Sequence, residues 1–361
     1  MRIEIDATSL LLRSAGIKNY TYHWIRHLQA LAAHGDSVTA FPFLGELGAL
    51  NHDGSNIGRF GTLWRIATLL AVNRAPVIDW IAGGGDVFHA SNQVRKPPKR
   101  TRLTATVHDL TCWLTPELHT AANVQADKSF ADQVLKRASG LIAVSENTRQ
   151  DAIRLLGVKP ENIRTIYSGI PDEFFDAVPT PKQKQYILFV GTIEPRKNLD
   201  ALLDAYLALR QDLKDVFDLL VAGPSGWASE RTMARLNSGL DGVRHLGYVA
   251  ERDLPGLTAG AAVFVYPSLY EGFGFPVAQA MAARVPVLTS NTSCLPEVAG
   301  PGAICVDPRS GSELAGALER LLEDAELRGR LGAAGREWAE RYRWESCAMQ
   351  SWEFFHEVRS D

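Results

Sequence analysis

The chain has 361 residues, which is more than one ordinary core needs and predicts two domains. Apolar residues make up 46% and charged residues 22%, as in globular proteins, which excludes large-scale disorder. The net charge of −3 gives no field that would attract nucleic acid, and the four cysteines show neither C-x-x-C pairs nor metal-ligand spacing with histidine, so we expect neither a nucleic-acid partner nor a metal site.

The beginning of the sequence bears on localisation. Glu4 and Asp6 stand where a signal peptide would need an apolar run, and no stretch approaches the roughly 20 apolar residues of a membrane span. We therefore expect a cytoplasmic protein. Peripheral contact with the inner face of the cytoplasmic membrane remains an open alternative.

Short apolar runs alternate with helical patterns through the first half, as in βαβ units that build a parallel sheet. Six strands are expected, at residues 3–7, 38–43, 87–90, 103–107, 141–144 and 163–167. A helix is expected over residues 20–31, where apolar residues recur at helical spacing. The first domain should therefore be a Rossmann-like domain of residues 1–176.

A polar segment with two prolines, residues 176–185, predicts an interdomain linker. Six more strands are expected after it, at residues 186–190, 217–222, 245–249, 262–266, 286–288 and 303–306. These strands, with helices over residues 199–209 and 313–322, predict a second Rossmann-like domain at residues 185–335. Residues 336–361 are purely helical and rich in aromatic side chains, so we expect them to pack back toward the N-terminal domain.

The segment from Ser268 to Ala282 follows an expected strand and has the features of an anion-binding loop. Pro276 suits the first turn of a helix, whose free N–H groups and positive dipole end would face the loop. Gly272 and Gly274 let backbone amides approach an anion without interference from a Cβ atom. An isolated E-G-x-G sequence is more often a simple turn, but the neighbouring segments favour a diphosphate site with Glu271 at its mouth.

A second segment, residues 191–198, also lies between a strand and a helix. It places Arg196 and Lys197 at the same carboxyl edge of the sheet. Adjacent cations are seldom buried unpaired, and they fit a diphosphate. The alternative is a solvated helix start.

These segments resemble the donor domain of glycosyltransferase family 4, whose members are retaining enzymes of the GT-B fold. The resemblance rests on residues 189–198, 247–249, 268–282 and 290–300 of the second half, and on residues 16–20, 107–110 and 144–148 of the first half. It implies an α/β protein with two Rossmann-like domains that face each other across a cleft. Residues 1–176 would form the acceptor side, and residues 185–335 would bind a nucleotide-sugar donor.

The resemblance also implies roles for single residues. Arg196 and Lys197 would hold the donor diphosphate, Glu271 would lie near the transferred sugar, and His108 would reach a sugar hydroxyl from the other domain. These four are the expected catalytic residues. The expected donor-binding residues are Gly16, Gly191, Tyr248, Val249, Gly272, Phe273, Gly274, Phe275 and Gln279. The sequence contains no D-x-D triplet, so we expect protein charges to replace a metal ion and no cofactor to be required.

Within the family, the sequence is most similar to mannosyltransferases of O-antigen and related polysaccharide biosynthesis. This similarity implies GDP-mannose as the donor and a glycan or lipid-linked saccharide as the acceptor. UDP-glucose is the second donor candidate. The family pattern has a second glutamate where this chain has Gln279, which predicts weaker donor affinity with the chemistry intact.

The sequence also leaves other functions open. A catalytically weak sugar-nucleotide-binding subunit is an alternative because of Gln279, while an epimerase or phosphorylase of the same fold resembles the motifs less closely. A nicotinamide dehydrogenase is disfavoured, because no G-x-G-x-x-G follows any expected strand.

The segment of residues 59–74 mixes arginines with bulky apolar residues, and residues 95–100 form a basic loop. A core-facing helix and a solvated loop are the favoured interpretation. The alternative is contact with anionic lipid or with a lipid-linked acceptor.

Overall fold

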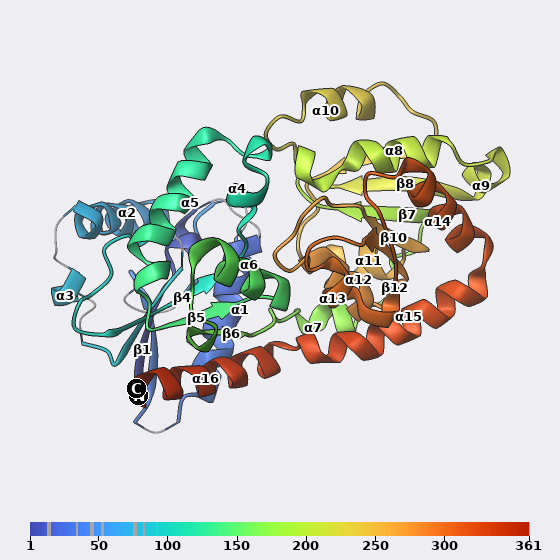
Figure 1. Cartoon of the computed structure of the whole chain (residues 1–361). Coiled ribbons are helices and arrows are strands. Elements are labelled where there is room, and N and C mark those ends of the chain that lie inside the picture. The colour runs from blue at the N-terminus through green and yellow to red at the C-terminus, as the bar shows by residue number, and fades with distance from the viewer. Residues whose placement is uncertain are drawn as a thin grey trace. The chain divides into compact units, whose positions relative to one another are not determined.

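The computed structural model describes residues 1–12, 16–33, 35–43, 47–51, 54–74, 78–81, 84–91 and 93–360 (Figure 1). The chain forms two compact units. The first comprises Met1–Gly169 and Trp344–Asp361, and the second comprises Ile170–Arg343.

The first unit contains a six-stranded parallel sheet in the order β2-β1-β3-β4-β5-β6. The strands are β1 (Arg2–Asp6), β2 (Ser37–Phe41), β3 (Val87–Ala90), β4 (Arg102–Val107), β5 (Gly140–Ala143) and β6 (Ile163–Thr165). The helices are α1 (Gly16–Leu31), α2 (Arg59–Arg74), α3 (Ile78–Ile81), α4 (Thr111–Leu114), α5 (Ala121–Gln133), α6 (Glu146–Leu156) and α16 (Trp344–Ser360). The expected strands of the first half are therefore all present.

The last helix, α16, packs against α1 within the first unit. Trp24 of α1 is buried, and its Nε1 donates a hydrogen bond to Ser351 Oγ of α16 at 2.9 Å. The Trp24 ring also lies 5.9 Å from the Phe355 ring. The aromatic residues at the end of the chain thus complete the core of the unit that begins at the N-terminus.

The second unit contains a second parallel sheet of six strands in the order β12-β11-β10-β7-β8-β9. The strands are β7 (Gln185–Val190), β8 (Phe217–Ala222), β9 (Val243–Gly247), β10 (Val263–Tyr266), β11 (Val287–Ser290) and β12 (Ala303–Val306). The helices are α7 (Asp172–Phe175), α8 (Leu199–Leu207), α9 (Gln211–Val216), α10 (Glu230–Leu236), α11 (Leu254–Ala259), α12 (Phe275–Ala282), α13 (Leu295–Ala299), α14 (Gly311–Glu323) and α15 (Ala325–Ala339). Among the helices of the ranges described above, none is both long and apolar enough to cross a membrane.

The boundary between the units lies at residues 169 and 170, earlier than the linker expected at residues 176–185. Phe174 and Phe175 of α7 are buried, and α7 contacts α11 and α12. The Thr180 N–H donates a hydrogen bond to the Gly256 carbonyl at 2.9 Å. The polar, proline-containing segment therefore runs along the second unit.

The strand order of the second sheet reverses between β7 and β10, which are paired neighbours. From β7 the chain proceeds to β8 and β9 on one side, and from β10 it proceeds to β11 and β12 on the other. Because such crossovers are right-handed, their helices lie on opposite faces of the sheet. The helices that follow β7 and β10 therefore leave toward opposite faces, and the carboxyl edge at such a point is where ligands bind in open α/β sheets.

Candidate active site

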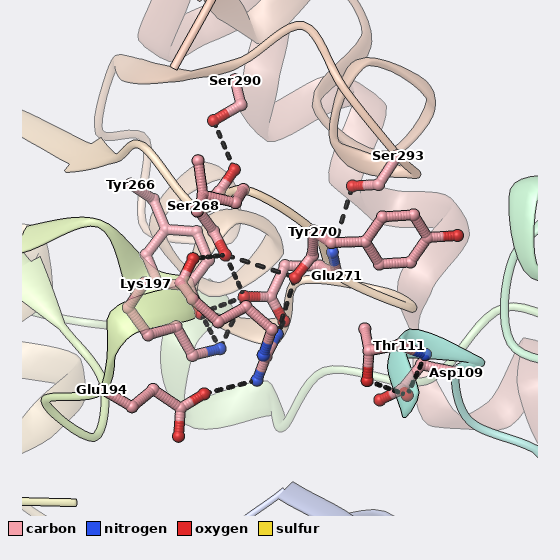
Figure 2. A network of polar contacts seen from close by, with 12 residues as sticks. Asp109, Thr111, Glu194, Lys197, Tyr266, Ser268, Tyr270, Glu271, Ser290 and Ser293 are labelled. Atoms are coloured by element: carbon pink, nitrogen blue, oxygen red, sulfur yellow. Dashed lines mark hydrogen bonds and ion pairs between the residues drawn. The ribbon is translucent and has the colours of Figure 1, made fainter. Parts of the chain in front are cut away.

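Arg196, Lys197 and Glu271 form one ion-pair cluster at this edge of the second sheet (Figure 2). Lys197 Nζ lies 2.5 Å from Glu271 Oε1, and the Arg196 guanidinium lies 2.8 Å from Glu271 Oε2. Each carboxylate oxygen therefore pairs with a different cation. Ser268 Oγ also donates to Glu271 Oε1 at 2.6 Å, and the Tyr266 hydroxyl accepts from Lys197 Nζ at 2.6 Å.

The two loops that carry these residues are tied together by the backbone. A short 3-10 helix, Pro195–Lys197, follows β7 and brings Arg196 and Lys197 to the sheet edge. Asn198 then adopts the left-handed conformation with φ of 54° and immediately precedes α8. The Leu269 N–H, from the loop after β10, donates to the Arg196 carbonyl at 2.8 Å. The cluster is thus held by main-chain contacts as well as by its charges.

Burial and charge act against each other on Glu271, which is only 7% exposed. Burial raises the pKa of this carboxyl, but the charges of Arg196 and Lys197, with hydrogen bonds from Lys197 and Ser268, outweigh it and hold the pKa at about 2. Burial also lowers the pKa of Lys197, with the charge of Arg196 acting in the same direction. Glu271 is therefore a carboxylate at neutral pH.

Glu194 extends the cluster on the side of Arg196. Its Oε1 lies 2.7 Å from the Arg196 guanidinium, and burial raises the pKa of this carboxyl against the opposing charges of Arg196 and Lys197. Both cations expected to hold a diphosphate therefore contact protein carboxylates and are largely buried. Their contact with a diphosphate stays a prediction.

The loop that leads into α12 presents backbone donors beside the cluster. Gly274 has φ of 83°, a left-handed conformation that favours glycine, and it immediately precedes the helix. The N–H groups of Phe273, Gly274 and Phe275 donate no hydrogen bond to any residue that the structure describes. Two residues before Phe273, the Glu271 N–H donates to Ser293 Oγ at 3.1 Å. Three main-chain donors at a helix N-terminus are thus free to bind an anion.

Gln279 lies in α12 and is buried. Its side chain makes no hydrogen bond within the described part of the chain, so its amide can accept or donate to a ligand. Its contact with the donor stays a prediction.

The remaining predicted donor-binding residues of this unit follow β7 and β9. The Gly191 carbonyl comes so close to Gly223 that a Cβ atom on Gly223 would lie 1.9 Å from it. The Gly223 N–H donates to the Gly247 carbonyl at 2.7 Å, which brings the end of β9 to the same edge. Tyr248, which is 45% exposed, and Val249 follow directly. These residues therefore lie on loops that extend from one edge of the sheet.

Two predicted residues, Gly16 and His108, belong to the first unit. Gly16 begins α1, and a Cβ atom added there would meet nothing within 4 Å, so packing in the described part of the chain does not require a glycine. His108 follows β4, and its ring lies 5.0 Å from the Tyr20 ring in an edge-on arrangement. Burial lowers the pKa of His108 to about 4, against the opposing charge of Asp109. The imidazole is therefore neutral at physiological pH.

Several residues of the cluster were not predicted as functional. Tyr266 was assigned only to a strand, and Ser268, Glu194 and Ser293 stood within the motif segments without roles. Tyr266 could have been found by one signal: it is a polar aromatic residue at the carboxyl end of a central strand. Each of the four forms a hydrogen bond or an ion pair with Arg196, Lys197 or Glu271.

Comparisons with known proteins cover both units. The chain matches the family descriptions Glycosyltransferase Family 4 over residues 15–174 and Glycosyl transferases group 1 over residues 171–338. It is 32% identical over 277 residues to the O-antigen chain mannosyltransferase B of Escherichia coli, covering 73% of this chain and 72% of that one. It is 30% identical to the MMP alpha-(1->4)-mannosyltransferase of Mycolicibacterium hassiacum over 61% of this chain, and it spans about half, 54%, of that relative. The fold is similar to Anabaena HepE, solved in complex with UDP and glucose, with a TM-score of 0.71, 18% identity, and 98% and 99% of the two chains covered.

Proposed function

The chain belongs to glycosyltransferase family 4, and from this membership we propose that it is a retaining mannosyltransferase that uses GDP-mannose as its donor. Two relatives named as mannosyltransferases support the choice of sugar. By analogy with the O-antigen relative, the acceptor is a glycan or a lipid-linked saccharide. UDP-glucose is the second donor candidate, since a protein of similar fold binds UDP and glucose.

One observation carries the proposal: free backbone amides at the start of α12 lie next to the cluster of Arg196, Lys197 and Glu271. Cleavage of the bond between the sugar and the diphosphate places negative charge on the leaving phosphate. Fixed N–H dipoles and cations stabilise that charge because they need not reorganise as it develops. The N–H groups of Phe273 to Phe275 bind the diphosphate, and Arg196 and Lys197 add positive charge beside it.

The same step places positive charge on the sugar ring. Glu271 is held as a carboxylate by its two cationic partners, so it can stabilise a developing cation at neutral pH. A leaving-phosphate oxygen takes the proton of the acceptor hydroxyl while the new bond forms on the same face of the sugar. Retention therefore requires no separate protein base.

We further propose that the reaction needs no metal ion, because Arg196, Lys197 and the amides supply the positive charge. Transfer in the presence of EDTA at an unchanged rate would support this, and restoration by added Mg²⁺ or Mn²⁺ of a rate lost to EDTA would contradict it. The relatives named as transferases favour an active enzyme over a catalytically weak binding subunit.

The direct test measures donor binding and transfer separately. Thermal shift is recorded with GDP-mannose, UDP-glucose, GDP and UDP; a ligand at 100 times its dissociation constant adds about 2.7 kcal/mol of apparent stability. Donor hydrolysis or transfer to mannose-containing acceptors is then followed with the preferred donor. Stabilisation by GDP-mannose with mannose transfer supports the proposal. Stabilisation by UDP-sugars alone would overturn the donor assignment, and binding without turnover would overturn the enzymatic one.

A further inference from the structure

Helix α2 (Arg59–Arg74) of the first unit turns an apolar face to solvent. Phe60 is 91% exposed, Trp64 is 68% exposed and Leu63 is 65% exposed. The exposed positions recur at helical spacing along one stripe: Phe60, Leu63, Trp64, Ala67, Leu70 and Ala71. Surface helices of globular proteins normally point polar side chains outward, so an apolar stripe on the solvent side of α2 is unusual.

The opposite face of α2 fixes this orientation. Val72 is fully buried in the core of the first unit, and Leu69 packs partly buried against the same core. Arg65 turns inward, with its guanidinium over the Phe43 ring at 5.3 Å. The helix thus has one apolar face in the core and another in solvent, and it cannot bury the second face by rotating.

A basic loop, residues 93–100, is hydrogen-bonded to the C-terminal end of α2. Lys96 Nζ donates to the Arg74 carbonyl at 2.9 Å. The Arg95 N–H donates to Asn73 Oδ1 at 2.9 Å, and Asn73 Nδ2 donates to the Gln93 carbonyl at 3.1 Å. Because these bonds join the loop to the last turn of α2, the apolar stripe and the loop form one continuous surface.

Charge on this surface is unbalanced. Residues 59–102 contain eight arginines or lysines and two aspartates, a net charge of +6, although the whole chain carries −3. Six of the cations are exposed and form no ion pair with an acidic side chain in the described ranges: Arg59, Arg74, Arg95, Lys96, Lys99 and Arg100. Elsewhere on the chain, arginines commonly pair with carboxylates, as Arg343 does with Asp172 at 2.6 Å.

We propose that α2 and the loop of residues 93–100 form a docking surface for an anionic lipid bilayer. Aromatic side chains such as Phe60 and Trp64 settle at the boundary between headgroups and acyl chains, while neighbouring cations contact the lipid phosphates. The surface supplies both components side by side. A protein partner or a second copy of the chain would need a matching apolar strip bordered by acidic groups. An anionic bilayer presents an apolar interior and negatively charged headgroups over its whole surface.

Vesicle co-sedimentation of the full chain tests this. We expect binding to phosphatidylcholine vesicles that contain phosphatidylglycerol, with affinity falling as salt rises, and much weaker binding to phosphatidylcholine alone. Phe60→Gln with Trp64→Gln should lower the partition coefficient about tenfold or more. Arg95→Gln, Lys96→Gln, Lys99→Gln and Arg100→Gln together should lower it by about a hundredfold or more and weaken its salt dependence, with Arg59 and Arg74 left to supply the remainder.

Matched controls distinguish binding through this surface from nonspecific adsorption to vesicles. Val178→Gln with Met349→Gln removes other exposed apolar side chains, and Lys159→Gln with Lys182→Gln removes other exposed cations; both should leave binding unchanged. Donor thermal shifts should be equal in all variants, so failure here is distinguishable from failure of the proposed reaction. The proposal is overturned if the wild type ignores anionic vesicles, if the α2 variants bind as well as the wild type, or if those substitutions instead dissociate a dimer.

Discussion

Lys197 Nζ and Glu271 Oε1 lie 2.5 Å apart, although the two residues follow different strands and are separated by more than seventy positions in the sequence. Both side chains are nearly buried, so neither charge can be satisfied by water. Removing one partner would leave a buried charge unpaired, which is far more costly than losing a surface ion pair. A substitution that removes only one of the two charges should therefore destabilise the fold as well as affect the proposed chemistry.

The first prediction concerns stability against pH. The pKa of Glu271 is depressed from 4.5 to about 2, so the folded state favours the carboxylate. Its contribution is present at pH above 4.5 and is lost as pH falls toward 2; it is of the order of 3 kcal/mol, because each pKa unit corresponds to about 1.4 kcal/mol. Denaturant unfolding of the wild type and Glu271→Gln should differ most at neutral pH and converge in acid. A difference that is independent of pH would contradict the assigned pKa.

The second prediction concerns the two cations. Arg196→Ala with Lys197→Ala should lower turnover by about a hundredfold or more, since the leaving phosphate loses fixed positive charge. Steady-state transfer rates would be compared with those of Arg210→Ala with Lys214→Ala, a matched pair away from the cluster, with Arg210 immediately before α9 and Lys214 within it. Circular dichroism verifies folding. Near wild-type turnover in the first variant would remove the diphosphate role.

The sheets could be predicted from the sequence because apolar runs mark every strand. The boundary between the units could not, since the polar residues 176–185 suggested a linker. What the pattern missed was the pair Phe174 and Phe175, whose burial keeps this segment on the second unit. Composition indicates a loop, but it does not indicate which unit the loop packs against.

The candidate site could be predicted only in part, because local sequence gives the position of a residue along its strand but not its partner. Motif order placed Arg196 and Glu271 at strand ends, and parallel strands bring such ends to one edge. That the two side chains pair depends on β10 lying next to β7, in the register Val263 opposite Ile187, which is a tertiary fact. The network through Tyr266 also depends on this pairing and on side-chain orientation, so local sequence could not reveal it.

The third prediction concerns Gly274. Its φ of 83° is unfavourable for any residue with a Cβ, and an added Cβ would lie 2.8 Å from Leu295 Cδ2. Gly274→Ala should therefore cost about 1 kcal/mol of stability and weaken donor binding by displacing the N–H groups around it. Gly316→Ala in α14, where an added Cβ meets no atom, is the control. Unchanged donor affinity, measured by calorimetry on Gly274→Ala, would argue against the amide cradle.

The fourth prediction concerns His108. Because burial lowers its pKa to about 4, the imidazole stays neutral across physiological pH and can exchange hydrogen bonds with a sugar hydroxyl without titrating. His108→Gln should lower kcat by about tenfold or more, and the ratio of wild-type to variant kcat should be constant across neutral pH. His356→Gln, at an exposed position of α16, should have no effect. A ratio that changes near the ordinary histidine pKa of 6.5 would show that His108 acts as a titrating group.

The last prediction concerns Gln279, whose buried amide is free to contact a ligand. If this side chain accepts hydrogen bonds from the donor ribose, then Gln279→Glu should tighten donor binding, because a charge-assisted bond is roughly twice as strong as a neutral one. The gain expected is about 1 kcal/mol, or roughly fivefold in the dissociation constant. Gln183→Glu makes the same charge change at an exposed position and should leave affinity unchanged. Because the contact exists in both the ground and transition states, KM should fall while kcat stays constant. A loss of affinity in Gln279→Glu, or a change in kcat alone, would place this residue away from the ribose.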